Sequence, residues 1–186
     1  MASAFNEIED HEIVRQFQEE GNEEKAFSML VKKHQERLYW HIRRMVLNHE
    51  DTNDILQNVF IKVWRGLKNF RSDSSLFTWL YRIGTNETLT FIERNKKNRA
   101  RSLSDHESYL ENTLKAEKGF DITKLEWKLQ MAIQSLPPKQ KIVFTMRYYD
   151  EMSYENMAKI LDTTEGGLKA SYHLAVKKIE EFILKN

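Results

Sequence analysis

The chain has 186 residues, of which 40% are hydrophobic and 31% charged, with six glycines, two prolines and no cysteine. The lack of cysteine excludes a disulfide framework, a thiolate metal site and a cysteine nucleophile. The net charge of +1 gives no global sign of a nucleic-acid partner, whereas the scarcity of glycine and proline favours an all-α protein.

The N-terminal part of the chain is predicted to form four helices, at residues 8–20, 23–48, 51–67 and 78–95. A Ser/Asp-rich turn at residues 67–77 separates the last two. The acidic N-terminus lacks the apolar core of a signal peptide, and no apolar run approaches the ~20 residues of a membrane-spanning helix. We therefore expect a cytoplasmic protein.

The predicted helix at residues 51–64 has two different faces. At about 100° per residue, its apolar side consists of Ile55, Leu56, Val59, Phe60 and Val63. Its other side consists of Asp51, Asp54, Gln57, Asn58 and Lys62, with Ile61 among them. Asp and Asn are poor helix formers, so their use on a merely solvated face would be unusual. This pattern raises the question of what the polar side binds.

An aromatic stretch follows, with Phe70, Phe77, Trp79, Tyr81 and Phe91 upstream of a basic run at residues 94–101. Aromatic rings beside Arg and Lys are typical of binding to unpaired bases, since rings stack on bases and cations bind the backbone. Arg82 and Asn86, one turn apart, share a helix face and are placed to hydrogen-bond a base edge. The alternative is that the aromatic residues form core and that the basic run is a solvated helix end favoured by the helix dipole.

Residues 102–120 are polar and weakly periodic, which is typical of a linker. We therefore expect two small helical domains joined by a flexible linker: an N-terminal domain at residues 1–101, a linker at 102–121 and a C-terminal domain at 122–186.

The C-terminal domain is predicted to contain a helix-turn-helix. Ser153 is a good N-cap for a first helix with Tyr154, Met157, Ala158 and Leu161 at apolar spacing. After a short turn, Thr164 can cap a second helix that buries Leu168, Tyr172, Ala175 and Ile179 and turns Gly166, Lys169, Ala170, His173 and Lys177 outward. Such lysines can contact phosphates or base edges in a major groove. The alternative is a purely structural helical hairpin.

Three ordered motifs resemble those of bacterial sigma factors, in the extracytoplasmic-function (ECF, group 4) branch of the sigma-70 family. They are DTNDILQNVFIKVW with the pattern Asp-x-x-Asp-x-x-Gln-x-x-Phe, FTWLYRIGTNE with Trp-Leu-x-x-Ile-x-x-Asn, and LPPKQKIVFTMRYYDEMSYENMAKIL. The resemblance covers most of the chain. It implies a transcription initiation factor that binds core RNA polymerase, recognises promoter −10 and −35 elements and assists strand opening.

The resemblance also implies a role for each surface. The polar side of the first motif would dock on the clamp helices of the largest polymerase subunit, through Asp51, Asp54, Gln57, Asn58 and Ile61. The flap of the second-largest subunit would be a further contact. The −10 element would be bound, partly as a flipped base, by Phe70, Arg71, Asp73, Ser74, Ser75, Phe77, Trp79, Arg82, Asn86, Arg94, Lys96, Lys97, Arg99 and Arg101.

The second helix of the C-terminal motif would contact the −35 element through Thr164, Gly166, Gly167, Lys169, Ala170, Ser171, His173 and Lys177. Here the chain departs from the family, because Ser171 and Val176 occupy positions that are commonly arginine. We therefore expect weak duplex binding that depends on Lys169, His173 and Lys177. The promoter spacer implied by the family, about 16–17 base pairs, is ~55 Å long, and a linker of roughly 20 residues spans it only when nearly extended.

Other classes of protein explain less of the sequence. A dimeric helix-turn-helix regulator with a small effector would leave the polar side of residues 51–64 without a role. A helical scaffold would explain only the core positions. An enzyme lacks support, because no phosphate loop, nucleophile elbow, metal-binding histidine pair or convergent acid pair is present. We expect no catalytic residue, metal or cofactor, and we expect an anti-sigma protein as a further partner.

Overall fold

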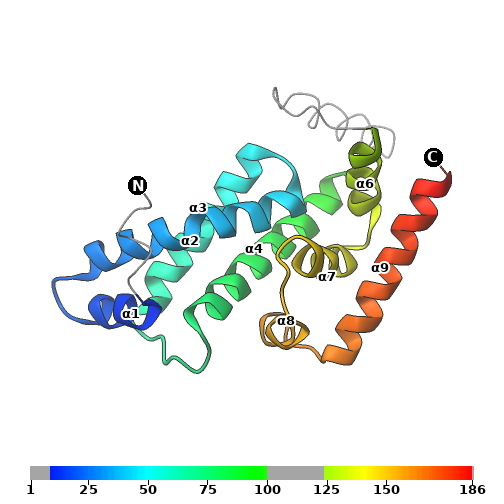
Figure 1. Ribbon diagram of the computed structural model, residues 1–186. Helices are drawn as coiled ribbons and strands as arrows, with labels where there is room; N and C mark the ends of the chain where they lie inside the picture. The colour runs from blue at the N-terminus through cyan, green and yellow to red at the C-terminus, as the bar shows by residue number, and fades with distance from the viewer. Residues whose placement is uncertain (1–8, 100–123, 186) are drawn as a thin grey trace.

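The structure is a computed structural model that describes residues 9–99 and 124–185. The predicted linker at residues 102–121 and Arg101 lie outside the described residues, as do the side chains of Lys96, Lys97 and Arg99. Within the described ranges the chain is all-helical (Figure 1), as predicted. The helices are α1 (Asp10–Gln18), α2 (Glu23–Val46), α3 (His49–Leu67), α4 (Leu76–Arg99), α6 (Lys124–Ser135), α7 (Pro138–Tyr148), α8 (Tyr154–Leu161) and α9 (Glu165–Lys185).

Local capping explains where the helices begin and end. α3 begins two residues before the predicted start, because the Asn48 side chain accepts a hydrogen bond from the backbone N–H of Asp51 at 2.9 Å. α4 likewise begins at Leu76, since the Ser75 hydroxyl accepts from the backbone N–H of Thr78 at 3.1 Å. α2 ends at Val46, because Leu47 adopts a left-handed conformation with φ of 63°.

Helices α1 to α4 form an N-terminal unit in which α2, α3 and α4 lie side by side and α1 packs against α2 and α3. Its core contains the apolar side chains that the helical spacing places inward. On α3 these are Ile55, Val59 and Val63, all fully or nearly fully buried. The apolar side of α3 therefore faces the core as predicted, and Leu56 and Phe60 pack half-buried at its margin.

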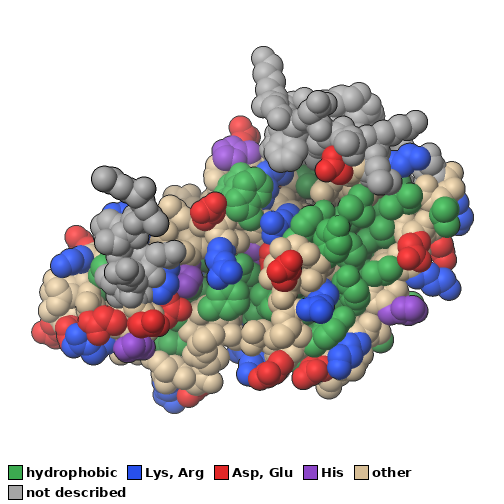
Figure 2. All heavy atoms as spheres, viewed as in Figure 1, with side chains coloured by type: hydrophobic (Ala, Val, Ile, Leu, Met, Phe, Trp, Pro, Cys, Tyr) green, Lys and Arg blue, Asp and Glu red, His purple; other side chains and the backbone are tan. Residues whose placement is uncertain are grey.

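Helices α6 to α9 form a C-terminal unit in which α9 packs against α6, α7 and α8. A small core joins α6, α7 and α9 through Ala132, Ile133, Leu136, Phe144, Ala175 and Ile179. Figure 2 shows hydrophobic side chains gathered over α7 and α9 on the side facing the viewer. Among the large apolar side chains of these two helices, Tyr148, Leu174 and Leu184 are exposed.

The two units pack directly on one another, which the sequence did not predict. α8 lies against α4, and α7 lies against α2 and α4 (Figure 1). One buried cluster therefore runs through both units and includes Leu38, Ile42 and Leu80 from the first and Met146 and Met157 from the second. None of the described helices is long and apolar enough to cross a membrane.

Candidate protein- and nucleic-acid-binding surfaces

The polar side of α3 is turned toward solvent. Asp54, Gln57 and Asn58 are exposed, Asp51 is half-buried, and Ile61 is exposed over 42% of its surface. The prediction that residues 51–64 form a helix with one apolar and one polar side is thus confirmed. Lys62, which shares this side, forms an ion pair with Glu87 of α4.

Asp51 has a structural role in addition to any binding role. It lies in the first turn of α3, where a carboxylate interacts favourably with the positive end of the helix dipole. No comparable local role applies to Asp54, Gln57 or Asn58, which lie further along the helix. The stability of the helix therefore does not explain why these three polar residues are present on its surface.

An exposed tryptophan extends this surface, and the sequence analysis missed it. Trp64, one turn after Ile61, is 40% exposed. Its ring is held edge-on by Phe17 and Phe27, with ring centroids 5.1 and 4.9 Å away. Ile61 and Trp64 together give the polar side of α3 an apolar part of fixed orientation. The spacing of three residues between them was the available signal.

The aromatic residues near the Ser/Asp-rich loop pack against the protein. Phe70 lies against Trp79 with ring centroids 5.0 Å apart, and Phe77 against Tyr81 at 4.2 Å. Phe70, Phe77 and Trp79 are half-buried against the core, whereas Tyr81 is buried. The core alternative therefore holds for Tyr81, while the other three rings each retain a partly open surface.

The loop between α3 and α4 presents polar side chains. Arg71, Asp73 and Ser75 are exposed and Ser74 is half-buried. The Ser75 hydroxyl already caps α4 and lies 2.8 Å from Oγ1 of Thr78. Gln18 of α1, which the sequence analysis did not identify, donates from Nε2 to the carbonyl of Phe70 at 3.1 Å. The start of the loop is thereby tied to the N-terminal helix.

Three of the predicted DNA-contacting residues of α4 are exposed, and one of them, Arg82, already contacts another helix. Arg82 and Asn86 are exposed one turn apart, and Arg94 is exposed further along. The Arg82 guanidinium donates a hydrogen bond to the backbone carbonyl of Lys159 in α8. The structure therefore brings a predicted −10 residue against the helix-turn-helix.

The helix-turn-helix forms as predicted. The Ser153 hydroxyl accepts from the Asn156 N–H at 3.2 Å, and the Thr164 hydroxyl accepts from the Gly167 N–H at 3.2 Å. Asp162 makes the turn in a left-handed conformation, with φ of 49°. One expectation is corrected: Tyr172 is half-buried rather than buried, because its ring stacks at the edge of the core on Phe144, 5.8 Å away.

The outward side of α9 is open. Its exposed residues are Thr164, just before the helix, and Gly166, Gly167, Lys169, Ala170, His173 and Lys177, whereas Ser171 is half-buried. The Lys169 ammonium lies 3.5 Å from Oε2 of Glu165 and 5.5 Å from the centre of the Tyr154 ring. Glu165 therefore partly offsets the charge of Lys169. Among the described residues, no group of three or more His, Asp or Glu side chains is arranged to hold a metal ion.

Comparisons with known proteins match these two units to two family regions. The family model described as Sigma-70 region 2 matches residues 30–98, which span most of α2 through α4. The model described as Sigma-70, region 4 matches residues 126–179, which span α6 through most of α9. The chain belongs to the sigma-70 family. The two sigma-70 regions share the buried cluster that runs through both units. Their polar sides include the exposed side of α3 and the outward side of α9.

Curated relatives of this sigma-70 chain cover nearly its full length. It is 28% identical over 93% of its length to the RNA polymerase sigma-H factor of Pseudomonas aeruginosa, covering 93% of that protein. It is 29% identical over 95% of its length to the ECF RNA polymerase sigma-E factor of Haemophilus influenzae, covering 96% of that protein. The expected ECF resemblance is therefore confirmed.

Solved structures share the fold. The structure of CnrH in complex with the cytosolic domain of CnrY matches with a TM-score of 0.67 at 20% identity, over 95% of this chain and 98% of that one. The sigma factor RpoE in complex with the anti-sigma factor NepR from Bartonella quintana matches with a TM-score of 0.63 at 18% identity, over 86% of this chain and 97% of that one.

Proposed function

We propose that this chain is a transcription initiation factor that binds core RNA polymerase and directs it to promoters. It recognises −10 and −35 elements and assists strand opening. The observation that carries the proposal is the polar side of α3, with Asp54, Gln57 and Asn58 exposed around Ile61, in a chain of the sigma-70 family.

The chemistry of this side suits a basic protein partner. Carboxylates and amides form directional, charge-assisted hydrogen bonds to lysine and arginine. An exposed apolar side chain such as Ile61 supplies the dehydrated centre that protein interfaces have. The partner expected from the family is the clamp-helix pair of the largest polymerase subunit, and Trp64 lies beside the same contact.

The −10 element is assigned to the loop at residues 68–75 and to α4. The exposed polar groups of Arg71, Asp73 and Ser75, with half-buried Ser74, suit the hydrogen-bonding edge of a flipped base. The open surfaces of Phe70, Phe77 and Trp79 supply stacking of ~1–3 kcal/mol per base, which offsets the few kcal/mol that extrusion costs. The adjoining backbone is assigned to Arg82, Asn86, Arg94, Lys96, Lys97, Arg99 and Arg101.

The −35 element is assigned to the start of α9. Its exposed glycines and Ala170 allow close approach of the backbone to a duplex, and Lys169, His173 and Lys177 supply the polar contacts. Because Ser171 and Val176 occupy positions that are commonly arginine in the family, duplex contact here is weak, and the exposed pair of Glu165 with Lys169 weakens it slightly further. The factor acts by binding rather than by catalysis.

We also propose an anti-sigma protein as the regulator of this chain in the cytoplasm. The support is the fold shared with RpoE, which was solved with the anti-sigma factor NepR. The flap of the second-largest polymerase subunit is the further partner proposed for the C-terminal unit.

The test is binding to core polymerase together with promoter-directed transcription in vitro. Asp54→Lys should raise the dissociation constant for core polymerase by about tenfold or more, since it places a cation against a basic partner. Glu180→Lys makes the same change on an exposed position of α9 outside every proposed surface and should alter binding less than about twofold. Equal affinity of the Asp54→Lys variant and the unmodified chain would refute the polymerase-binding role.

A further inference from the structure

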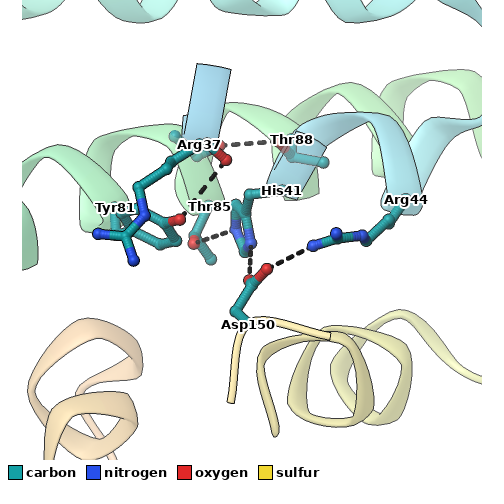
Figure 3. A network of polar contacts seen from close by, with 8 residues as sticks. Arg37, His41, Arg44, Tyr81, Thr85, Thr88 and Asp150 are labelled. Carbon is teal, nitrogen blue, oxygen red and sulfur yellow. Dashed lines mark hydrogen bonds and ion pairs between the residues drawn. The ribbon is translucent and has the colours of Figure 1, made fainter. Parts of the chain in front are cut away.

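Asp150 joins the two units of the chain. It lies in the loop between α7 and α8, and its side chain is only 8% exposed. One carboxylate oxygen lies 2.6 Å from Nη1 of Arg44, and the other lies 2.9 Å from Nδ1 of His41. Both partners belong to α2, on the opposite side of the boundary between units (Figure 3).

The histidine in this contact is fixed on both sides. The His41 side chain is completely buried, and its Nε2 lies 3.1 Å from the hydroxyl of Thr85 in α4. Because an ionised carboxylate only accepts hydrogen bonds, Nδ1 of His41 is the donor to Asp150. Burial, and next the negative charge of Asp150, raise the pKa of the neighbouring Tyr81 hydroxyl. The carboxylate is thus held in a dehydrated and pre-arranged position.

Two further polar contacts across the boundary complete helix ends. Gln134 of α6 donates from Nε2 to the carbonyl of Arg44 at 3.2 Å, within the last turn of α2. Arg82 of α4 donates to the carbonyl of Lys159, within the last turn of α8. The last four carbonyls of a helix lack partners inside it, so each contact satisfies a group that would otherwise need water. Arg44 also lies over the ring of Tyr149, with its guanidinium carbon 4.8 Å from the ring centre.

This closed arrangement conflicts with simultaneous contact to two promoter elements. α8, which leads directly into the proposed −35 helix, packs on α4, which carries proposed −10 residues. The two elements lie ~55 Å apart along the promoter that the family implies. Arg82, one of the proposed −10 residues, is already bound to α8. The polar side of α3, in contrast, stays exposed.

We propose that Asp150, through its ion pair with Arg44 and its hydrogen bond with His41, holds the free chain closed and unable to contact both promoter elements. This inference rests on the proposed function. The chain first meets the polymerase through α3, and assembly with the enzyme separates the two units.

The test uses the absence of natural cysteine from the sequence. Spin labels are attached at Gln35→Cys and Glu180→Cys, two exposed positions on α2 and α9 outside all proposed surfaces, and the distance between them is measured by double electron–electron resonance. The free full-length chain should show one narrow distribution. Asp150→Arg places a cation against Arg44 and His41 and should broaden the distribution to longer distances, with the open population rising on the order of tenfold or more.

Three further variants distinguish loss of the Asp150 contacts from a general destabilisation of the fold. Asp150→Asn retains a hydrogen-bond acceptor and should stay closer to the natural distribution than Asp150→Arg. The double variant Arg44→Asp with Asp150→Arg exchanges the charges and should restore the narrow distribution. Asp10→Arg removes a similar carboxylate, paired with His34 and Lys33 inside the N-terminal unit, and should leave the distance unchanged. An Asp150→Arg chain as narrow as the natural one overturns the proposal, as does a double variant that remains open.

Adding core RNA polymerase distinguishes this inference from the function on which it rests. The distance in the natural chain should lengthen on binding, and persistence of the short distance in the bound chain overturns the proposed opening. If polymerase does not bind at all, the proposed function fails. The distances in the free variants still report whether Asp150 holds the units together.

Discussion

Trp79 of α4 lies so close to Gly66 of α3 that a Cβ atom at position 66 would lie 2.9 Å from Cζ2 of the indole ring. Real Cβ contacts are essentially never this short, so glycine at this position lets the two helices approach. The same tryptophan supports Phe70 at the start of the loop assigned to the −10 element. The geometry of that loop therefore depends on position 66 of the neighbouring helix being a glycine, which has no side chain.

Gly66→Ala should destabilise the chain despite the better helix propensity of alanine. The steric cost of overpacking is typically 1–3 kcal/mol, against a propensity gain of up to ~1 kcal/mol, so we expect a net loss of about 1 kcal/mol in the free energy of unfolding. Gly166→Ala is the control, because a Cβ there has no neighbour within 4 Å, and it should be neutral or slightly stabilising. Denaturant titration of both variants measures these changes in the free energy of unfolding. A stabilising Gly66→Ala would show that the indole ring moves aside freely.

Acid should weaken the contact between α1 and α2. The hydrogen bond from His34, with a further contribution from Lys33, lowers the pKa of Asp10 to about 2. A depressed carboxyl pKa stabilises the fold above the unfolded value near 4, and the effect is lost as the pH falls from about 4 toward 2. Asp10→Asn should therefore cost about 1–2 kcal/mol near pH 6, after allowance for partial exposure, and much less near pH 2.

The measurement for Asp10 is the free energy of unfolding of both chains across this pH range. Glu36→Gln removes an exposed carboxylate from α2 and should cost little at any pH. A penalty for Asp10→Asn that stays constant from pH 6 to pH 2 would contradict the assignment of the stabilisation to the ionised carboxylate.

The core contact of α9 can be tested with two leucines on the same helix. Leu168 is 2% exposed, whereas Leu184 is 86% exposed. Leu168→Ala should lower the free energy of unfolding by about 2–5 kcal/mol, because it removes buried methyl groups and leaves a cavity. Leu184→Ala should change it by less than about 0.5 kcal/mol. Thermal or denaturant unfolding compares them directly, and similar losses for both would mean that the described packing of α9 is wrong.

Salt dependence should reveal whether Lys169 contacts phosphate. If it does, Lys169→Ala in the assembled polymerase complex weakens promoter binding and reduces the slope of log K against log salt by about 0.9. Lys185→Ala, at the far end of the same helix, should leave the slope unchanged. An unchanged slope for Lys169→Ala would remove this lysine from the proposed −35 surface.

The sequence predicted the parts of the fold that depend on local chemistry. The spacing of Ile55, Val59 and Val63 identified the inner side of α3, and Ser153 and Thr164 identified the starts of α8 and α9. These features follow from periodicity and capping within a few residues of each position. The polar side of α3 was found for the same reason.

The contacts between the units could not be predicted in this way. Asp150 binds His41 across 109 positions in the chain, and neither the loop aspartate nor the helical histidine has a local pattern that identifies the other. The aromatic residues were equally hard to assign from sequence. Trp79 is a residue type that stacks on bases, but its ring packs over Gly66. Composition shows which contacts a side chain can make, whereas the tertiary fold decides which of them it makes.

The buried cluster shared by Leu38, Ile42 and Leu80 with Met146 and Met157 has a consequence for the stability of the molecule as a whole. Segments that rest on one contiguous core lose their order cooperatively. Heating the free chain should therefore give a single calorimetric transition rather than one for each family region. A destabilising substitution in the C-terminal unit should lower the melting temperature of the N-terminal unit to the same extent.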